Sequence, residues 1–268
     1  MESQIKNYGL VISDIEDPQA YTLGGLVDLP KIVLHPDGNW QDFLPVYEPQ
    51  FNSQFDSYGC TVFGTENVVE TLLRKLTGNE RNFSERFIYI LAKIRPPGAD
   101  PHDICEVVRR NGLIENDLLP MTATWEEFIT PDPMTVELLV EGQKFQYEVK
   151  HTYVWRGRIS KDERTKLIRE HLRYSPLGVS VTAWFREGEV YVDNGQPNTH
   201  WCVLYGESEQ GWLIFDSYDH SKKILSRDHN IQLCKRFMLV EKKPVSNWTT
   251  DIIKRLWSFI KDLCNRAG

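Results

Sequence analysis

The stretch "NSQFDSYGCTVFGTENVVETLLRKLTG", residues 52–78, decides how the rest of the sequence is interpreted, because a cysteine stands where an expected helix begins. Apolar residues from Val62 to Leu76 recur at helical spacing, and Gly78 is a typical residue just past a helix end. A helix N-terminus lowers the pKa of a thiol and favours the nucleophilic thiolate. Cysteine is also among the most frequently buried residue types. Cys60 is therefore either a packing residue or a nucleophile, and other residues must decide.

The composition is that of an ordinary globular protein. The chain has 268 residues, of which 41% are hydrophobic and 26% are charged. Its net charge is -7 and the sequence has no block of basic residues, which argues against a nucleic-acid partner. We expect no integral membrane segment, because no run of about 18 apolar residues occurs. No signal-peptide pattern opens the sequence, so a cytoplasmic protein is expected, with association with a virus particle as an alternative. Five cysteines without a CxxC pair argue against disulfides and a structural zinc site.

The two halves of the chain differ in the periodicity of their apolar residues. In the first half, helical spacing predicts helices over 60–76, 84–94 and 102–112, and Ser84 is a typical N-cap. The second half alternates apolar and polar residues, which is typical of strands, around one further helix at 160–175. The expected strands lie within 136–155, 178–185, 189–193, 200–206, 211–218 and 235–242. This order indicates the α+β class, with a functional site in the groove between the halves.

Three parts are expected along the chain. Residues 1–50 contain several prolines that break up any long element, so they are predicted to form a lead segment that wraps a main domain at 51–245. At the end of the chain, 246–268 places apolar residues along one helical face, with Trp257 among them. This amphipathic helix is expected to pack on its own domain, to bind a partner or a second copy, or to lie on a membrane surface.

His200 and Asp216 are expected to be neighbours in space. His200 lies at the start of one expected strand, and Asp216 lies at the end of the next. If the two strands form a hairpin through the "GESEQG" turn, both residues return to the same edge of the sheet. A carboxylate that orients an imidazole allows the ring to exchange a proton with a thiol. Cys60, His200 and Asp216 therefore form a candidate catalytic set, although His200 taken alone is more often a structural histidine than a catalytic one.

The order and spacing of four residues resemble the papain-like cysteine peptidases. Gln54 lies six residues before Cys60, and Asp216 lies sixteen residues after His200 in "FDSYD". Those peptidases have a glutamine, a cysteine at a helix start, a histidine on a strand and an asparagine in an "NSW" motif at equivalent separations. Shorter stretches resemble the stand-alone bacterial and phage members of the family, namely "YGLVISDIEDPQAY" (8–21), "GCTVFG" (59–64), "VVRRNGLIENDLLPM" (107–121) and "LGVSVTAW" (177–184).

The resemblance covers roughly residues 8–240. It implies a papain-like α+β fold, in which an active-site cleft separates a helical subdomain from an antiparallel β-barrel-like subdomain. The implied activity is that of a cysteine endopeptidase, which hydrolyses peptide or isopeptide bonds through a thioester and needs no cofactor or metal. Its partner would be a peptide or protein substrate.

The resemblance also implies a role for each matching residue. Cys60 would be the nucleophile, His200 its base and acid partner, and Asp216 the residue that orients the imidazole. The side-chain amide of Gln54 and the backbone N–H of Cys60 would form the oxyanion hole, where such donors stabilise the developing charge. Contacts with the substrate are expected from Gly98, Thr199, Trp201 and Tyr218.

The sequence departs from the family pattern at several positions. The orienting residue is Asp216 instead of asparagine, and its negative charge would favour the imidazolium form of His200. Tyr218 replaces a tryptophan that covers the histidine hydrogen bond, and Gly98 lies only near the expected place of a glycine pair that lines the substrate groove. No long inhibitory pro-segment is expected, so narrow specificity or another device would restrain the activity.

Two other sets of residues and two other functions are alternatives to this interpretation. Asp219 and His220, just past Asp216, are second candidates for the triad role, and His102 with its neighbours Asp100 and Asp103 is a possible metal site that lacks partners at metal-ligand spacing. An acyltransferase could use the same triad, although Gln54 argues against it. A papain-like domain retained for binding or assembly, for example in a phage particle, is the alternative outside catalysis.

Overall fold

The computed structural model describes residues 6–13, 29–218 and 222–242. Its helices are η2 (Gln41–Phe43), α1 (Cys60–Thr77), α2 (Glu85–Ala92), α3 (Pro101–Asn111), η3 (Asn116–Leu118), α4 (Trp125–Ile129), α5 (Val136–Gln143) and α6 (Lys161–Leu172). Its strands are β1 (Tyr147–Arg156), β2 (Leu177–Val181), β3 (Arg186–Glu187), β4 (Val190–Tyr191), β5 (His200–Glu207), β6 (Trp212–Phe215), β7 (Lys222–Leu225) and β8 (Leu233–Glu241). The protein therefore belongs to the α+β class, as its sequence predicts.

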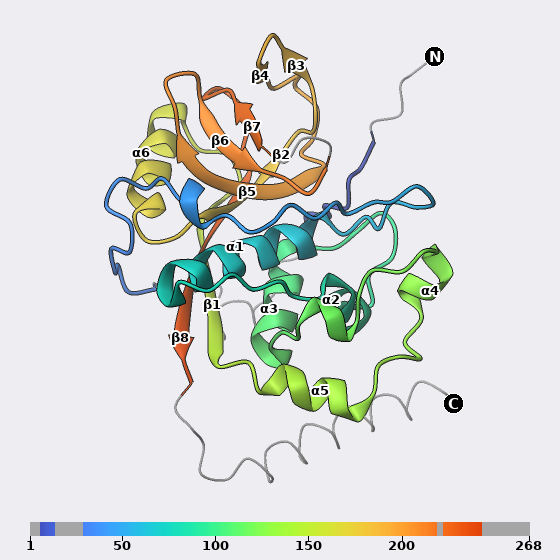
Figure 1. Ribbon diagram of the computed structural model, residues 1–268. Coiled ribbons are helices and arrows are strands. Elements are labelled where there is room, and N and C mark those ends of the chain that lie inside the picture. Colours follow the sequence, from blue (N-terminus) through green and yellow to red (C-terminus); the bar gives the residue numbers. More distant parts are fainter. Residues whose placement is uncertain (1–5, 14–28, 219–221, 243–268) are drawn as a thin grey trace, which may run out of the picture.

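Helix α1 occupies the centre of the molecule (Figure 1). It contacts β5, β8 and β2 on one side and α2 and α3 on the other. Every residue from Cys60 to Leu73 is buried, which is typical of a helix enclosed by protein on all sides. Gly78 ends α1 in the left-handed region, with φ at 74°, where glycine carries no steric cost. The expected helix at this position is confirmed.

The flanking helices begin at side-chain caps. The hydroxyl of Ser84 accepts a hydrogen bond from the Phe87 backbone N–H at the start of α2, and the carboxylate of Asp100 accepts one from the His102 backbone N–H at the start of α3. Such caps satisfy backbone donors that have no partner within the helix. The predicted helices over 84–94 and 102–112 are confirmed, with ends that differ by a residue or two.

The eight strands form one mostly antiparallel sheet in the described part of the chain. Their order is β1-β8-β2-β5-β6-β7-β4-β3, and β4 pairs with β7 in parallel. Long strands β1 and β8 extend down beside the helical half, whereas β5, β6 and β7 lie above α1 in the view of Figure 1. The sheet thus contacts the helices both beside α1 and along its upper face.

One predicted strand is partly wrong. Alternation over 136–155 predicted a strand along its whole length, but the first half forms helix α5. The hydroxyl of Thr135 caps this helix by accepting from the Leu138 backbone N–H, and Gly142 allows close contact with the Phe87 ring. Local capping and packing on α2 therefore override the alternating pattern. Only β1, which begins at Tyr147, keeps the strand conformation.

Short strands replace two longer predictions. The stretch 178–185 was expected to be extended throughout, but β2 ends at Val181. Only the two residues of β4 form a ladder within the expected strand at 189–193. The strands predicted over 200–206, 211–218 and 235–242 correspond to β5, β6 and β8.

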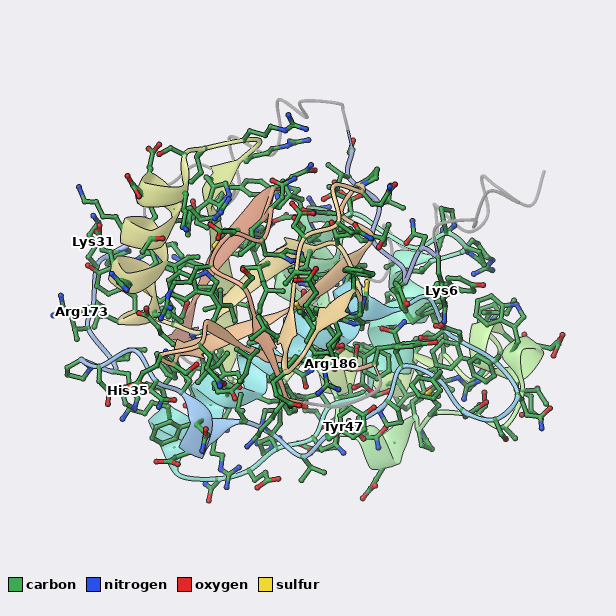
Figure 2. The ribbon with its side chains drawn as sticks, turned by 90° about the horizontal axis from the view of Figure 1, so that it is seen from above. Lys6, Lys31, His35, Tyr47, Arg173 and Arg186 are labelled. Atoms are coloured by element: carbon green, nitrogen blue, oxygen red, sulfur yellow. The ribbon has the colours of Figure 1, made fainter. Side chains whose placement is uncertain are left out.

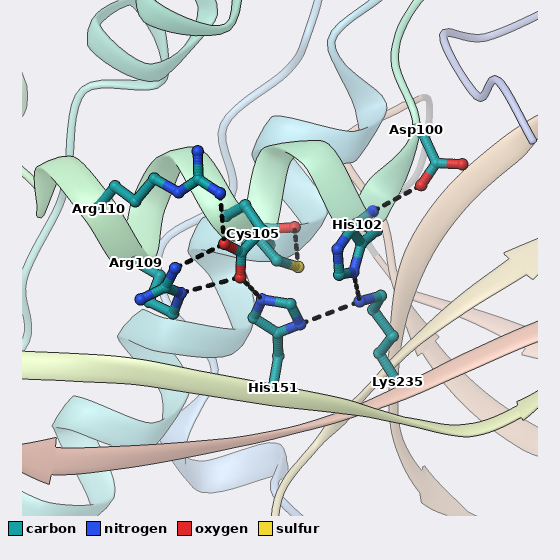
Figure 3. Close-up of polar contacts among 9 residues, drawn as sticks. Asp100, His102, Cys105, Arg109, Arg110, His151 and Lys235 are labelled. Carbon is teal, nitrogen blue, oxygen red and sulfur yellow. Dashed lines mark hydrogen bonds and ion pairs between the residues drawn. The ribbon is translucent and has the colours of Figure 1, made fainter. Parts of the chain in front are cut away.

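A buried polar cluster joins α3 to the sheet (Figure 3). The Lys235 amine on β8 lies 3.0 Å from Nδ1 of His151 on β1 and 3.2 Å from Nδ1 of His102 on α3. Nε2 of His151 lies 3.0 Å from Oε1 of Glu106, and Arg109 donates two hydrogen bonds to the same carboxylate. We call these five residues the α3–sheet cluster. They fix the helix that follows Asp100 against the two longest strands.

The described part of the lead segment contacts the sheet half. The backbone N–H groups of Leu34 and His35 donate to the Arg173 carbonyl, and the Trp40 indole donates to the Leu172 carbonyl at the end of α6. Figure 2 shows His35 and Arg173 on one side of the molecule and Lys6 on the opposite side. The predicted helix over 246–268 lies outside the described residues.

Within the described part of the chain, no helix combines the length and the hydropathy required to cross a bilayer.

Candidate active site

Cys60 begins α1 and lies against the first residues of β5. Its side chain is fully buried in a small apolar cluster with Trp201 and Leu10, and the backbone N–H of Trp201 donates to its sulfur. Burial raises the pKa of the Cys60 thiol well above its ordinary value, and the hydrogen bond from Trp201 offsets only part of this effect. The lowered pKa expected from the helix start is therefore absent in this conformation.

His200 and Asp216 are hydrogen-bonded neighbours. Strands β5 and β6 pair in antiparallel fashion, as the predicted hairpin requires. Nε2 of His200 lies 2.5 Å from Oδ1 of Asp216, and both side chains are fully buried. Nδ1 of His200 is also buried and has no hydrogen-bond partner among the described residues. The Trp201 backbone, directly after His200, donates to the sulfur, and the charge of Asp216 acts on the thiol, so the His200–Asp216 pair lies near Cys60.

Lys223 binds the other oxygen of Asp216. Its amine donates to Oδ2 at 2.7 Å and to the carbonyl of Tyr218 at 2.5 Å. Burial raises the pKa of the Asp216 carboxyl, but the charges and hydrogen bonds of His200 and Lys223 outweigh this effect and lower it overall. Asp216 is therefore a carboxylate held between an imidazole and an ammonium group.

Aromatic rings surround the imidazole. The Tyr8 ring lies edge-on to His200 at 5.3 Å between centroids, and the Trp184 ring lies edge-on at 5.5 Å. Tyr218, which was expected to shield the histidine, instead contacts Tyr8 and Phe51. Trp184 is thus the indole beside His200, and it comes from the loop after β2 rather than from the sequence after Asp216.

Residues 6–13 cover the site, and we call them the covering segment. The backbone N–H of Tyr8 donates to the Thr199 carbonyl, and the covering segment pairs with Ala99 on its other side through a parallel bridge at Leu10. Leu10 itself is buried and packs on Cys60. Backbone hydrogen bonds to both neighbouring segments and an apolar side chain over the sulfur therefore separate the thiol from solvent.

Two glycines allow this close contact. Gly9 has φ at 114°, and a Cβ atom there would lie 2.1 Å from the Tyr58 carbonyl oxygen. Gly98 has φ at 133°, and a Cβ atom there would lie 1.8 Å from the Gly9 carbonyl oxygen. Neither position tolerates a side chain without displacement of the backbone. Gly98, predicted to contact the substrate, contacts the covering segment here.

Gln54 is the residue that the resemblance assigns to the oxyanion hole. It lies at an exposed bend, and its backbone N–H donates to the Asn52 side chain. The buried glutamine is Gln50, whose Nε2 donates to the carbonyl oxygen of Tyr8 at 2.9 Å. Its Oε1 accepts from the hydroxyl of Ser217, the residue after Asp216. Gln50 is thus an amide donor that is held by Ser217 and faces the covering segment.

The remaining residues expected to bind substrate have different surroundings. The Thr199 carbonyl accepts from the covering segment, so its backbone lies at the edge of the site. The Trp201 ring fills the space between Gly64 of α1 and Gly178 of β2, at distances that only glycine permits. Trp201 is therefore a packing residue between helix and sheet. Tyr218 lies next to the covering segment and accepts a hydrogen bond from Lys6.

Other candidates contribute little to the site. Asp100 caps α3, and His102 belongs to the α3–sheet cluster, so both have structural partners. Among the described residues no group of three His, Cys, Asp or Glu side chains could hold a metal ion. Asp219 and His220, the second candidates for the triad, lie outside the described residues.

Comparisons with solved structures agree with this architecture. Xylellain, a cysteine protease from Xylella fastidiosa, matches 91% of this chain and 99% of its own, with a TM-score of 0.60 and 16% identity. The chain has the papain-like fold. The bromelain protease from Ananas comosus covers 79% of this chain and 100% of its own (TM-score 0.52, 16% identity), and procathepsin L 3 from Tenebrio molitor covers 81% and 77% (TM-score 0.53, 12% identity). No family model and no curated protein matches the sequence.

Three residues of the site, Gln50, Lys223 and Tyr8, carry only weak signals in the sequence. Gln50 lies ten positions before Cys60, beyond the expected spacing, and Lys223 is one of two adjacent lysines on a short strand. Only Lys222 is exposed, whereas Lys223 is buried. Tyr8 falls in the stretch that resembles the lead segment of stand-alone papain-like peptidases, but nothing in its residue type indicates that it covers the imidazole.

Proposed function

We propose that this protein is a cysteine endopeptidase whose covering segment must move before a substrate binds. The observation that supports this is the His200–Asp216 pair beside Cys60, which opens the central helix of a papain-like fold. Nδ1 of His200 has no partner among the described residues, so no other side chain competes for the proton that the proposed reaction takes from the sulfur. These features provide a nucleophile, a base and an orienting group.

The proposed reaction proceeds through a thioester. The Cys60 sulfur attacks the carbonyl carbon of a peptide, and His200 transfers a proton to the departing amine. A water molecule, deprotonated by the same imidazole, then attacks the thioester and releases the acid, which restores the thiol. Asp216 keeps the imidazole in the required tautomer throughout.

We assign the side-chain donor of the oxyanion hole to Gln50 instead of Gln54. Nε2 of Gln50 already donates to the backbone carbonyl oxygen of Tyr8, the residue whose ring contacts the His200 imidazole. The Ser217 hydroxyl fixes the orientation of the amide, so little reorganisation is needed when the oxygen of a substrate takes this place. Gln54 is exposed and turned toward Asn52, which makes it a suitable control.

The covering segment provides a way to restrain the proposed activity. While Leu10 packs on Cys60, burial raises the pKa of the thiol and keeps it in the unreactive protonated form. Departure of the covering segment would expose both the sulfur and the Gln50 amide. A peptide substrate would then take over the backbone contacts that Thr199 and Ala99 make with this segment.

Selective chemistry at Cys60 tests the proposal. We would treat the protein with iodoacetamide at mildly acidic pH, map the modified cysteines by mass spectrometry and assay cleavage of fluorogenic peptides. When the covering segment opens, Cys60 is expected to react before Cys105, Cys202 and Cys234, which lie in the protein core, and the variant Cys60→Ala should show no cleavage. Equal labelling of all these thiols would contradict an activated nucleophile. Selective labelling without cleavage would favour acyl transfer to another acceptor.

A pair of glutamine variants tests the assignment of the oxyanion donor. Gln50→Ala is expected to lower kcat about 10²- to 10³-fold, as loss of one such donor does in acyl-transfer enzymes. Gln54→Ala, on the exposed bend, should leave kcat within about twofold. The reverse order of effects would return the role to Gln54.

A further inference from the structure

Lys223 is buried next to the candidate triad, where a lysine needs a specific partner. Its amine lies 2.7 Å from Oδ2 of Asp216, and both side chains are shielded from solvent. The amine also donates to the Tyr218 carbonyl and lies 4.9 Å from the centre of the Trp184 ring. Lysine is almost never fully buried unless it is paired. The position of Lys223 is therefore explained by Asp216 and by the rings beside it.

Lys223, Asp216 and His200 follow one another in a row, in which a positive and a negative side chain precede the imidazole. Asp216 stands where the family pattern has a neutral asparagine, and a lone buried carboxylate there would bind the imidazolium of His200 very strongly. A general acid must also release its proton to the leaving amine, so excessive stabilisation of the imidazolium opposes catalysis. Lys223 cancels the extra negative charge from the side of Asp216 that faces away from His200.

We propose that Lys223 is a positioning residue that makes the Asp216 carboxylate equivalent to a neutral orienting group for His200. The proposal rests on the peptidase function proposed above. Because Oδ2 is held by the amine, Oδ1 stays directed at Nε2 of His200. Lys223 thus fixes both the rotamer and the net charge of the carboxylate.

The other groups that face this row support the assignment. The rings of Tyr8 and Trp184, which contact His200, are uncharged, and Lys6 lies farther out on the Tyr218 ring. Asp56 acts on the Cys60 thiol and forms an ion pair with Lys6. Lys223 is therefore the cation that contacts Asp216 directly in the described part of the chain.

Three variants test the proposal through the pH dependence of the reaction. In Lys223→Met the uncompensated carboxylate favours the imidazolium, so the alkaline limb of the kcat/KM profile should move up by about one pH unit. At neutral pH kcat should also fall about tenfold, because proton release is harder. Asp216→Asn leaves the lysine uncompensated and should move the limb down. The double variant Asp216→Asn/Lys223→Met should return it close to the wild-type position.

A second measurement separates this proposal from the proposed function. In the Cys60→Ala background, nuclear magnetic resonance of labelled histidine follows the titration of His200 without any turnover, and its midpoint should move in the same directions. If the protein is not a peptidase, this titration still reports the balance of charges. Lys222→Met, on the exposed neighbour, should leave the midpoint unchanged and serves as the matched control.

Two results would overturn the proposal. The first is a folded Lys223→Met protein whose pH profile and histidine titration equal those of the wild type. If Lys223→Met does not fold, Asp216→Asn alone decides, because it keeps the shape of the side chain. An unchanged midpoint in that variant would show that the charges of this row do not act on His200.

Discussion

Among the described residues, two lysines are buried in polar clusters, and their partners differ. Lys223 forms an ion pair with Asp216, which in turn binds His200. Lys235 lies in the α3–sheet cluster and contacts the Nδ1 atoms of two histidines instead of a carboxylate. The first cluster lies beside the candidate nucleophile, and the second joins α3 to β1 and β8 (Figure 3).

The comparison shows how the partner of a buried lysine sets the state of a neighbouring histidine. In the α3–sheet cluster, burial and the charge of Lys235 lower the pKa of His151 to about 3, against the opposite effect of Glu106. His151 is therefore neutral at physiological pH and acts as a hydrogen-bonding spacer. In the other cluster a carboxylate separates lysine from imidazole, so His200 is not exposed to an uncompensated positive charge. Only the arrangement of Lys223, Asp216 and His200 suits a histidine that must gain and lose a proton.

The largest expected effect is a difference in peptidase activity between variants of His200 and His151. His200→Gln is expected to lower kcat/KM for peptide cleavage by about 10²- to 10⁴-fold, because it removes the general acid and base. His151→Gln can still donate to Glu106 and accept from Lys235, so its kcat/KM should stay within about threefold of wild type. Steady-state assays with circular dichroism of both variants provide the measurement. Equal losses in the two variants would abolish the functional distinction between the clusters.

The next effect concerns stability and belongs to the α3–sheet cluster. Glu106→Gln removes the charge that binds Arg109 and His151, and we expect it to lower the free energy of unfolding by about 2 kcal/mol. The expected loss of unfolding free energy is smaller than for a fully buried ion pair, because Arg110, which also contacts Glu106, is half exposed. Chemical denaturation at pH 7 measures the change. Loss of peptidase activity without loss of stability would contradict the structural role.

The pH dependence of this contribution has a definite sign. Burial raises the pKa of Glu106, but hydrogen bonds from His151 and Arg109 outweigh it and lower the pKa below the ordinary value of 4.5. The stabilisation is therefore present above about pH 4.5 and is lost as the pH falls through the lowered value. The difference in stability between wild type and Glu106→Gln should accordingly shrink on acidification below pH 4.5.

A smaller effect concerns the cover over the first cluster. Gly9→Ala places a Cβ atom against the Tyr58 carbonyl, so the covering segment should be displaced and iodoacetamide should label Cys60 about tenfold faster. Labelling kinetics followed by mass spectrometry provide the test. Gly188→Ala is the matched control, because Gly188 also has a positive φ but no atom within 4 Å of the added carbon. An unchanged labelling rate in Gly9→Ala would show that the covering segment does not limit access to the thiol.

The smallest effect sharpens the contrast between the two lysines. Burial lowers the pKa of Lys235 below its ordinary value of 10.5. Between the lowered value and 10.5 the unfolded chain therefore binds more protons than the folded one. The free energy of unfolding should consequently rise with pH over this range. Lys235→Met should lose this rise, which we expect to be about 1 kcal/mol. Urea unfolding from neutral to alkaline pH tests it. A rise that persists in the variant would assign it to another group.

Local sequence patterns predicted much of the fold. The spacing of apolar residues and the capping residues located α1, α2, α3 and α6, and alternation located β5, β6 and β8, because these patterns act within one element. The same alternation was wrong for α5, where capping by Thr135 and packing on α2 decided the conformation. Patterns therefore failed where a contact from elsewhere in the chain competed with them.

The sequence predicted only those parts of the candidate site that depend on contacts between neighbouring elements. Hairpin geometry was sufficient to bring His200 to Asp216, because only one short turn separates the two strands. The choice between Gln50 and Gln54 depends on how the loop before α1 folds against Ser217, which lies 167 positions farther along the chain. Spacing along the sequence carries no information about such a contact.

The sequence by itself determined the helical and extended segments, the cysteine at the start of α1 and the order of the candidate catalytic residues. Only the tertiary structure decided that Tyr8 and Leu10 cover the site, that Gln50 supplies the buried amide and that Lys223 balances Asp216. The physical reason is that periodicity and capping act over a few residues. Burial, by contrast, raises the cost of an unpaired charge or amide, so the whole fold decides which distant side chain becomes its partner.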